Sequence, residues 1–189
     1  MAHLPRAVAI GGVCLVLATA AGVAAWLLLV QPAPAAATIA RPGAPAPQIA
    51  LQVVGGGTSD LTAERGKVVL VNFWATWCEP CKSEMPGLQQ LADELSDRSF
   101  VLYSVDLQED GPQVEAFQRQ YGLHLYAVLD DNGDVTRAYG VRALPATFLI
   151  DQQGVVRQQR LGPLLTGSAE TTWSEAWLAA QVRSLLATS

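Results

Sequence analysis

The chain has few of the residues that bind metals or stabilise small secreted scaffolds. Its 189 residues include only three cysteines and two histidines, and 17 acidic residues stand against 12 basic ones. So few cysteines exclude a disulfide-rich scaffold, and the excess of negative charge argues against nucleic acid as a partner. The sequence also has no internal repeat and no phosphate-binding glycine loop. We therefore expect no bound metal and no cofactor.

Charged residues are absent from residues 7–30. As a helix this stretch would reach roughly 36 Å, enough to cross a hydrocarbon core of about 30 Å. We expect a transmembrane anchor over residues 1–30; the alternative is a cleaved signal peptide, whose apolar region is usually only about 7–15 residues long. Arg6 is the only arginine or lysine before Arg41, and the positive-inside bias then places the N-terminus in the cytoplasm. The rest of a single-pass chain would lie outside the bacterial cytoplasmic membrane, in the periplasm.

Residues 31–47 are rich in alanine and proline, a composition typical of an extended tether. We therefore expect a linker there and a folded domain over residues 48–189. Cys14 lies inside the apolar stretch and follows Val13, which argues against lipid attachment and favours a small apolar residue within the span.

The remaining cysteines, Cys78 and Cys81, lie in the segment WCEPC. An apolar run at 68–75 predicts a buried strand before them, and a helix is expected after them. Because a helix start stabilises a thiolate, Cys78 is predicted to attack a partner disulfide and Cys81 to resolve the mixed disulfide. A structural disulfide is disfavoured because so short a loop constrains the unfolded chain little. Half of a zinc site is disfavoured because few other ligands are available.

The soluble part alternates apolar runs with helical patterns, which predicts an α/β fold. Strands are expected at 48–53, 67–74, 99–105, 125–129, 146–150 and 155–161, and helices at 80–96, 112–121, 135–139 and 170–187. The early strand, helix and strand form a right-handed βαβ unit. The later β-β-α order adds antiparallel strands, so a mixed central sheet flanked by helices is predicted.

Two segments resemble the signatures of the TlpA/ResA-type family of membrane-anchored, thioredoxin-like thiol:disulfide oxidoreductases, within the AhpC/TSA-redoxin superfamily. They are VNFWATWCEPCKSEMP at residues 71–86 and YGVRALPATFLID at residues 139–151. The resemblance runs from about residue 48 to 187. It implies a thioredoxin-like sandwich with a helix and a strand inserted at about 112–129, and a redox-active disulfide between Cys78 and Cys81.

The resemblance also implies roles for residues around the cysteines. Leu144-Pro145 matches a cis-proline loop and, with Trp77, is implied to contact the substrate; without the resemblance a trans bond is the default, since only about 5–6% of X–Pro bonds are cis. Glu84 matches a glutamate that controls cysteine ionisation. A carboxylate there raises a thiol pKa and can relay a proton to Cys81, although the residues alone are equally compatible with a solvated glutamate.

Three further residues bear on the direction of electron transfer. Asn72 stands where cytoplasmic thioredoxins have a buried aspartate, which leaves more of the acid–base work to Glu84. Glu79 and Pro80 lie between the cysteines and are expected to tune the redox chemistry. The carboxylates of Glu79 and Glu84 oppose a Cys78 thiolate, and a less stable thiolate lowers the reduction potential. We therefore expect a reductant.

The leading interpretation is a membrane-tethered protein-disulfide reductase. Its clients would be proteins with disulfides or CxxC motifs, and a membrane thiol electron donor would reduce it again. The resemblance implies clients in cytochrome c maturation or in copper-centre assembly, and the residues do not choose between them. A copper chaperone is an alternative that would need His124, the only histidine of the soluble part. A thiol peroxidase is a third, disfavoured by the paired cysteines.

Overall fold

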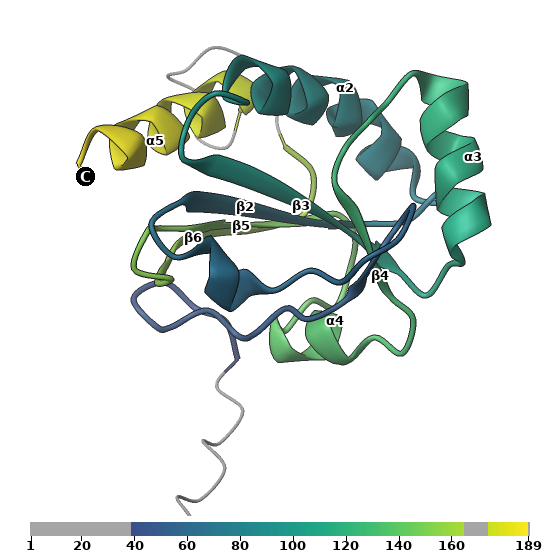
Figure 1. Ribbon diagram of the computed structural model, residues 1–189, viewed down its shortest axis with the longest axis horizontal. Coiled ribbons are helices and arrows are strands. Elements are labelled where there is room, and N and C mark those ends of the chain that lie inside the picture. The colour runs from purple at the N-terminus through teal and green to yellow at the C-terminus, as the bar shows by residue number, and fades with distance from the viewer. Residues whose placement is uncertain (1–38, 165–173, 189) are drawn as a thin grey trace, which may run out of the picture. The chain divides into compact units, whose positions relative to one another are not determined.

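The computed structural model describes residues 39–164 and 174–188. The expected anchor at 1–30 and the first part of the expected linker, 31–38, lie outside these residues. Within the described ranges, no helix is both long and apolar enough to cross a bilayer. The elements, shown in Figure 1, are β1 (Gln52–Val53), η1 (Leu61–Glu64), β2 (Val68–Trp74), α2 (Glu79–Glu94), β3 (Phe100–Leu107), α3 (Gly111–Tyr121), β4 (Ala127–Asp130), α4 (Asp134–Ala138), β5 (Ala146–Ile150), β6 (Val156–Leu161) and α5 (Glu175–Ala187).

The strands form one mixed sheet in the order β1-β4-β3-β2-β5-β6. Strands β2, β3 and β4 run parallel, whereas β1, β5 and β6 pair antiparallel with their neighbours. Figure 1 shows α2 and α5 over one face of the sheet and α4 beneath the other. The predicted mixed sheet flanked by helices is therefore confirmed, and so is the thioredoxin-like sandwich.

Strand β2 lies in the middle of the sheet, and all seven of its residues are buried. Because successive side chains in a strand point to opposite faces, β2 contributes to two cores. Val68, Leu70 and Trp74 pack with α2, α3 and α5. Val71 and Phe73 pack on the opposite face with α4 and the N-terminal segment of the domain. The strand is thus fixed from both sides, which gives the turn after Trp74 a rigid base.

The inserted helix and strand that the resemblance implies are α3 and β4. The carboxylate of Asp110 caps α3 by accepting a hydrogen bond from the backbone N–H of Gln113 at 2.8 Å. Gly122 ends the helix with a φ of 65°, a left-handed conformation that glycine adopts without steric cost. Figure 1 shows α3 beside the first turns of α2, so the insertion contributes to the surroundings of the cysteines.

The N-terminal edge of the domain differs from the sequence expectation. The backbone N–H groups of Gly43 and Ala46 donate to the carbonyls of Val156 and Gly154, and Ala40 and Ala44 are buried. The folded domain therefore begins before residue 48, because small apolar side chains pack well even in a proline-rich segment. The strand expected at 48–53 is also shorter than predicted: only Gln52 and Val53 pair, with β4.

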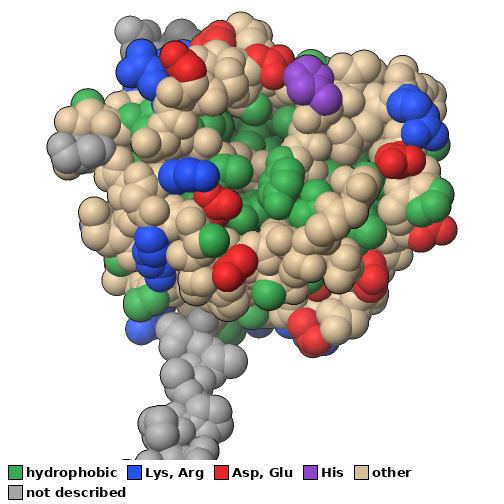
Figure 2. All heavy atoms as spheres, in the orientation of Figure 1, with side chains coloured by type: hydrophobic (Ala, Val, Ile, Leu, Met, Phe, Trp, Pro, Cys, Tyr) green, Lys and Arg blue, Asp and Glu red, His purple; other side chains and the backbone are tan. Residues whose placement is uncertain are grey.

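The last expected helix, 170–187, begins at Glu175 within the described residues, and its first four positions lie outside them. Figure 2 shows acidic and basic side chains scattered over one face of the molecule, with no broad patch of either sign on that face.

Candidate active site

Cys78 and Cys81 form a disulfide where β2 gives way to α2. Cys78 is the N-cap of α2, and its Sγ accepts a hydrogen bond from the backbone N–H of Cys81 at 3.3 Å. Cys81 is fully buried, whereas Cys78 keeps 5% of its surface exposed. The more accessible sulfur is thus the one at the positive end of the helix dipole, where a thiolate is stabilised after reduction.

Glu84, a residue of α2, is buried and not solvated, with 3% of its surface exposed. Its Oε1 accepts a hydrogen bond from Nδ2 of Asn72 at 2.8 Å, and its Oε2 accepts one from the backbone N–H of Leu164 at 2.9 Å. Burial raises the pKa of Glu84 to about 7, although both hydrogen bonds favour the charged form. The carboxyl can therefore both release and accept a proton near neutral pH.

Asn72 links Glu84 to the neighbouring strand. Its side-chain amide also donates to Oγ1 of Thr147 at 3.1 Å, and the two residues are register partners between β2 and β5. Glu84 follows Cys81 by three positions on α2, a spacing that brings Cβ atoms to about 5–6 Å from each other. The structure thus places the predicted acid–base residue next to the buried cysteine. The sequence did not reveal the contacts with Thr147 and Leu164, which lie far along the chain from Asn72 and Glu84.

The Leu144–Pro145 peptide bond is cis, as the resemblance implies. Pro145 is buried, and its carbonyl accepts a hydrogen bond from the backbone N–H of Gly162 at 2.9 Å. Among the residues that the structure describes, the backbone of Leu144 has no hydrogen-bond partner. Trp77, the other residue expected to contact substrate, is 66% exposed. An extended peptide could therefore pair with Leu144 and pack against Trp77.

The two residues between the cysteines lie at the surface. Glu79 is exposed and forms an ion pair with Lys82 at 3.0 Å, and the same contact raises the pKa of Lys82. Pro80 occupies the first turn of α2, where its missing N–H leaves no unsatisfied donor. Because Lys82 offsets the charge of Glu79, the buried Glu84 is the stronger influence on the thiols.

A second group of polar side chains near the cysteines was not predicted from the sequence. The carboxylate of Glu109 accepts hydrogen bonds from the backbone N–H and the hydroxyl of Thr76, each at 2.5 Å. Asp106, fully buried at the end of β3, accepts a hydrogen bond from the backbone N–H of Glu109 at 3.1 Å. Burial, together with the hydrogen bond and charge of Glu109, raises the pKa of Asp106 to about 8. The sequence did contain a signal for this group. The carboxyl ends of the parallel strands β2 and β3 adjoin each other, so polar residues that follow both strands are expected to meet there.

His124 lies at a different place. Its Nε2 is 2.9 Å from Oδ1 of Asp93, and its backbone N–H donates to the Gln89 side chain at 2.7 Å. Gln89 follows Cys81 by eight residues on α2, which corresponds to about 12 Å along the helix. Within the described residues, no group of three or more histidine, cysteine or acidic side chains could hold a metal ion. The histidine that the copper alternative would need therefore lies about two helical turns along α2 from Cys81.

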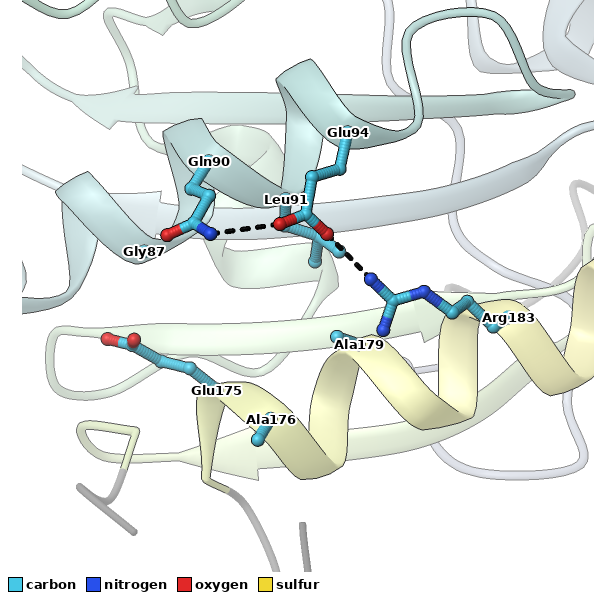
Figure 3. Close-up of a pocket in the computed structure, with 8 residues that line it drawn as sticks. All are labelled: Gly87, Gln90, Leu91, Glu94, Glu175, Ala176, Ala179 and Arg183. Carbon is cyan, nitrogen blue, oxygen red and sulfur yellow. Dashed lines mark hydrogen bonds and ion pairs between the residues drawn. The ribbon is translucent and has the colours of Figure 1, made fainter. Parts of the chain in front are cut away.

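Several cavities adjoin α2, and two of them are lined by Glu175 together with residues of this helix. One, of about 210 Å³, is lined by Glu84 together with Pro80, Ser83, Pro163, Leu164 and Glu175. The other, of about 280 Å³, lies between α2 and α5, and Figure 3 shows the ion pair of Glu94 with Arg183 at one end and Glu175 facing Gly87 at the other. Of these two cavities, only the first is lined by a residue of the cysteine site, Glu84.

Known proteins share both the sequence and the fold. Residues 42–159 match the AhpC/TSA family. The chain is 40% identical over 116 residues to the thiol-disulfide oxidoreductase ResA of Geobacillus thermodenitrificans, covering 61% of this chain and 67% of that one. It is 35% identical over 124 residues to the thioredoxin-like protein YneN of Bacillus subtilis, covering 65% and 72%. The crystal structure of a thioredoxin-family thiol:disulfide interchange protein from Chlorobium tepidum superposes with a TM-score of 0.65 at 28% identity, covering 78% of this chain and 98% of that one. With its paired cysteines at the start of α2, the chain belongs to the AhpC/TSA family and is a thiol-disulfide oxidoreductase.

Proposed function

We propose that this protein reduces disulfides of client proteins outside the cytoplasmic membrane, held there by its N-terminal segment. The observation that carries the proposal is the buried Glu84. It lies one helical turn after the resolving cysteine, and its pKa of about 7 lets it take up a proton at the pH of the reaction. A dithiol needs such a group because only the thiolate attacks.

The reaction moves two electrons from the protein to its client. The Cys78 thiolate attacks one sulfur of a client disulfide, which forms a mixed disulfide and expels the first client thiolate. Cys81 then gives its proton to Glu84 and attacks the sulfur of Cys78. The Cys78–Cys81 disulfide forms, and the second client thiolate leaves. The released thiolates take up protons, one of them from Glu84, and the client is left as a dithiol.

The surroundings of the thiols support this direction. A strong oxidase owes its high potential to a stabilised thiolate in its reduced form. Here the start of α2 favours the Cys78 thiolate, but the buried carboxyl of Glu84 opposes a second negative charge within a few ångströms of it. Since the reduced form is then less stable than in an oxidase, the pair donates electrons readily.

The client site fits an extended peptide that contains a disulfide. Within the described residues the backbone of Leu144 has no hydrogen-bond partner, its side chain packs against the core cluster that includes both cysteines, and the ring of Trp77 next to Cys78 is exposed. A CxxC segment such as the haem-binding site of a cytochrome c apoprotein has the required chemistry, because its thiols must be free before haem is attached. Peroxide is too small to use these peptide contacts, which favours disulfide exchange over peroxidase activity.

The location proposal rests on the sequence. Residues 7–30 carry no charge, and a catalytic domain that reduces disulfides is needed where disulfides form. Alkaline phosphatase fused after residue 38 should be active if the domain is exported, whereas a cytoplasmic reporter fused at the same residue should then be inactive. The reverse result would contradict export, and recovery of the first fusion in a soluble fraction would contradict the anchor.

Mixed-disulfide trapping tests the function. A Cys81→Ala variant, made in a Cys14→Ala background so that Cys78 is the only thiol, should accumulate client proteins bound through Cys78 when expressed in the native host. The trapped clients should be proteins with CxxC segments, cytochrome c apoproteins among them, and reducing agents should release them.

The matched control is Cys78→Ala in the same background, which leaves Cys81 alone and fully buried. It should trap nothing. If both variants trap the same proteins, or if Cys78 remains unmodified in cells, Cys78 is not the attacking residue. Trapping of copper proteins alone would contradict the cytochrome assignment while leaving the exchange reaction intact.

A further inference from the structure

Thr76, two residues before the attacking cysteine, is held by a single carboxylate. Glu109 accepts hydrogen bonds from both the backbone N–H and the hydroxyl of Thr76. The side-chain amide of Gln113, one turn into α3, donates to the same hydroxyl at 3.0 Å and also to Glu109. The turn that carries Cys78 is therefore tied to α3 as well as to β2.

The backbone around Glu109 is shaped to present this carboxylate. Gln108 has a φ of 62°, a left-handed conformation that is uncommon for residues other than glycine and has an energetic cost. On the other side of Glu109, Asp110 caps α3. Glu109 is thus fixed between an unusual turn and a helix start, and 9% of its surface is exposed. Its position is set independently of Thr76.

Asp106 completes the arrangement. Its Oδ1 accepts the backbone N–H of Glu109, whereas its Oδ2 is buried without a hydrogen-bond donor among the described residues. A protonated Asp106 resolves this, because its hydroxyl can donate to the Glu109 carboxylate. The pKa of Asp106 is raised to about 8, first by burial and then by the hydrogen bond and charge of Glu109, with Asp131 acting in the same direction. No basic side chain of the described residues forms an ion pair with either carboxyl.

We propose that Glu109 is a positioning residue for disulfide exchange, which holds the turn before Cys78 through Thr76, and that Asp106 keeps it in place by carrying a proton and donating it in a hydrogen bond. Glu109 does not touch the reacting sulfurs. It acts by fixing the backbone on which Cys78 lies, so that the sulfur stays at the start of α2 when the disulfide opens.

The consequence is a limit at alkaline pH. Once Asp106 loses its proton, two negative charges face each other in a buried site and the hydrogen bond between them is lost. The hydrogen bonds from Thr76 to Glu109 then weaken, and Cys78 is no longer held at the start of the helix. Glu109 from the β3–α3 turn and Asp131 from the loop after β4 are the charged groups that act on Asp106, and both favour its protonated form.

The test compares Glu109→Gln with Asp106→Asn. Glutamine can accept only one of the two Thr76 hydrogen bonds and carries no charge, so the rate of alkylation of reduced Cys78 by iodoacetamide at pH 7 should fall about tenfold. The pH profile of that rate should shift as well. Asparagine can donate to Glu109 as the protonated acid does, so Asp106→Asn should keep the wild-type rate at pH 7 and lose the decline above pH 8. Glu115→Gln, which removes an exposed carboxylate of α3, is the matched control and should behave as the wild type.

A purely structural role would lower the unfolding temperature of Glu109→Gln without moving the pH profile of Cys78, and that result would overturn the proposal. A tenfold loss at pH 7 in Asp106→Asn would overturn the proton assignment. If Glu109→Gln does not fold, Thr76→Val, which removes the hydroxyl and keeps the N–H, should give a smaller shift of the same profile, and an unchanged profile would overturn the proposal. The inference rests on exchange at Cys78 but not on its direction. Alkylation of the wild-type protein first checks that reduced Cys78 is reactive. The client trapping described above separately tests whether the protein reduces its clients.

Discussion

Two buried carboxyl sites lie on opposite sides of strand β2, and they hold their protons by different means. Glu84, on the β5 side, is a carboxyl whose two oxygens each accept a hydrogen bond. Asp106, on the β3 side, faces the second carboxylate of Glu109. Burial raises the pKa of both, to about 7 and about 8. The difference suggests separate roles: a carboxyl that accepts two hydrogen bonds can change its charge during the reaction, whereas one that faces a second carboxylate at close range keeps its proton and acts as a fixed donor.

Removing a cysteine should have the largest effect, because both sites act through the same pair of sulfurs. Cys78→Ala should reduce the turnover of a fluorescent peptide disulfide to the uncatalysed background, since no accessible thiolate remains. Cys81→Ala should complete the first attack and then stop at the mixed disulfide. Multiple turnovers by Cys78→Ala would show that Cys81 can attack on its own.

Glu84→Gln should have the next largest effect, because it removes the group that changes charge. We expect the rate of client reduction at pH 7 to fall by about 10- to 100-fold, as when a general base is lost, and the inflection of the pH–rate profile near pH 7 to disappear. Glu94→Gln, on the same helix but in an exposed ion pair with Arg183, is the control and should be nearly unchanged. If Glu84→Gln keeps the inflection, another group moves the proton.

Stability against pH compares the two sites directly. Each carboxyl has a folded-state pKa above its ordinary value, so the folded protein binds more protons than the unfolded chain, and the free energy of unfolding falls as pH rises. Glu84 lowers the free energy of unfolding between pH 4.5 and about pH 7, and Asp106 lowers it between pH 3.8 and about pH 8. The stabilisation that each carboxyl contributes is fully present below its pH range and is lost above it.

Glu84→Gln and Asp106→Asn should each remove one of these losses. Between pH 5 and 8, urea unfolding should show a decline in stability that is smaller than that of the wild type by roughly 2–3 kcal/mol for Glu84→Gln and roughly 3–4 kcal/mol for Asp106→Asn. The decline that remains should end near pH 7 in Asp106→Asn and should continue to about pH 8 in Glu84→Gln. Curves parallel to that of the wild type would mean that the two carboxyls are ionised throughout.

The smallest expected effect comes from outside both sites. Because Trp77 is 66% exposed, Trp77→Ala should leave the thermal unfolding temperature nearly unchanged. The KM for a peptide disulfide should rise about three- to tenfold with little change in kcat, as expected for a lost aromatic contact. Tyr126→Ala, at another exposed aromatic side chain, should change neither constant. A fall in kcat without a change in KM would place Trp77 in the chemical step instead of in client binding.

The sequence predicted the parts of the fold that depend on local pattern. A continuous apolar run predicts β2, a helical period predicts α2, and the WCEPC segment lies between them. The thioredoxin-like arrangement, the insertion and the cis peptide bond before Pro145 came from the resemblance to a family and not from periodicity. The start of the folded domain was predicted too late in the chain, because composition does not reveal which small side chains pack against the rest of the domain.

The electrostatics of the site could not be predicted from the sequence. From the sequence alone, Glu84 is equally compatible with a solvated residue. The hydrogen-bond donors that show otherwise are Asn72, 12 residues before it, and Leu164, 80 residues after it. Thr76 and Glu109 are 33 residues apart. Such pairs form only when the sheet brings the ends of β2 and β3 and the loop after β6 together, which local pattern does not encode.

The reduction potential of the Cys78–Cys81 couple tests the central claim most directly. Equilibration of the protein with glutathione or dithiothreitol buffers, followed by quantification of free thiols, gives the value. A potential below about −200 mV is predicted, because the buried carboxyl of Glu84 disfavours the thiolate form. A value near the roughly −120 mV of a strong oxidase would contradict the claim that this protein is a reductant.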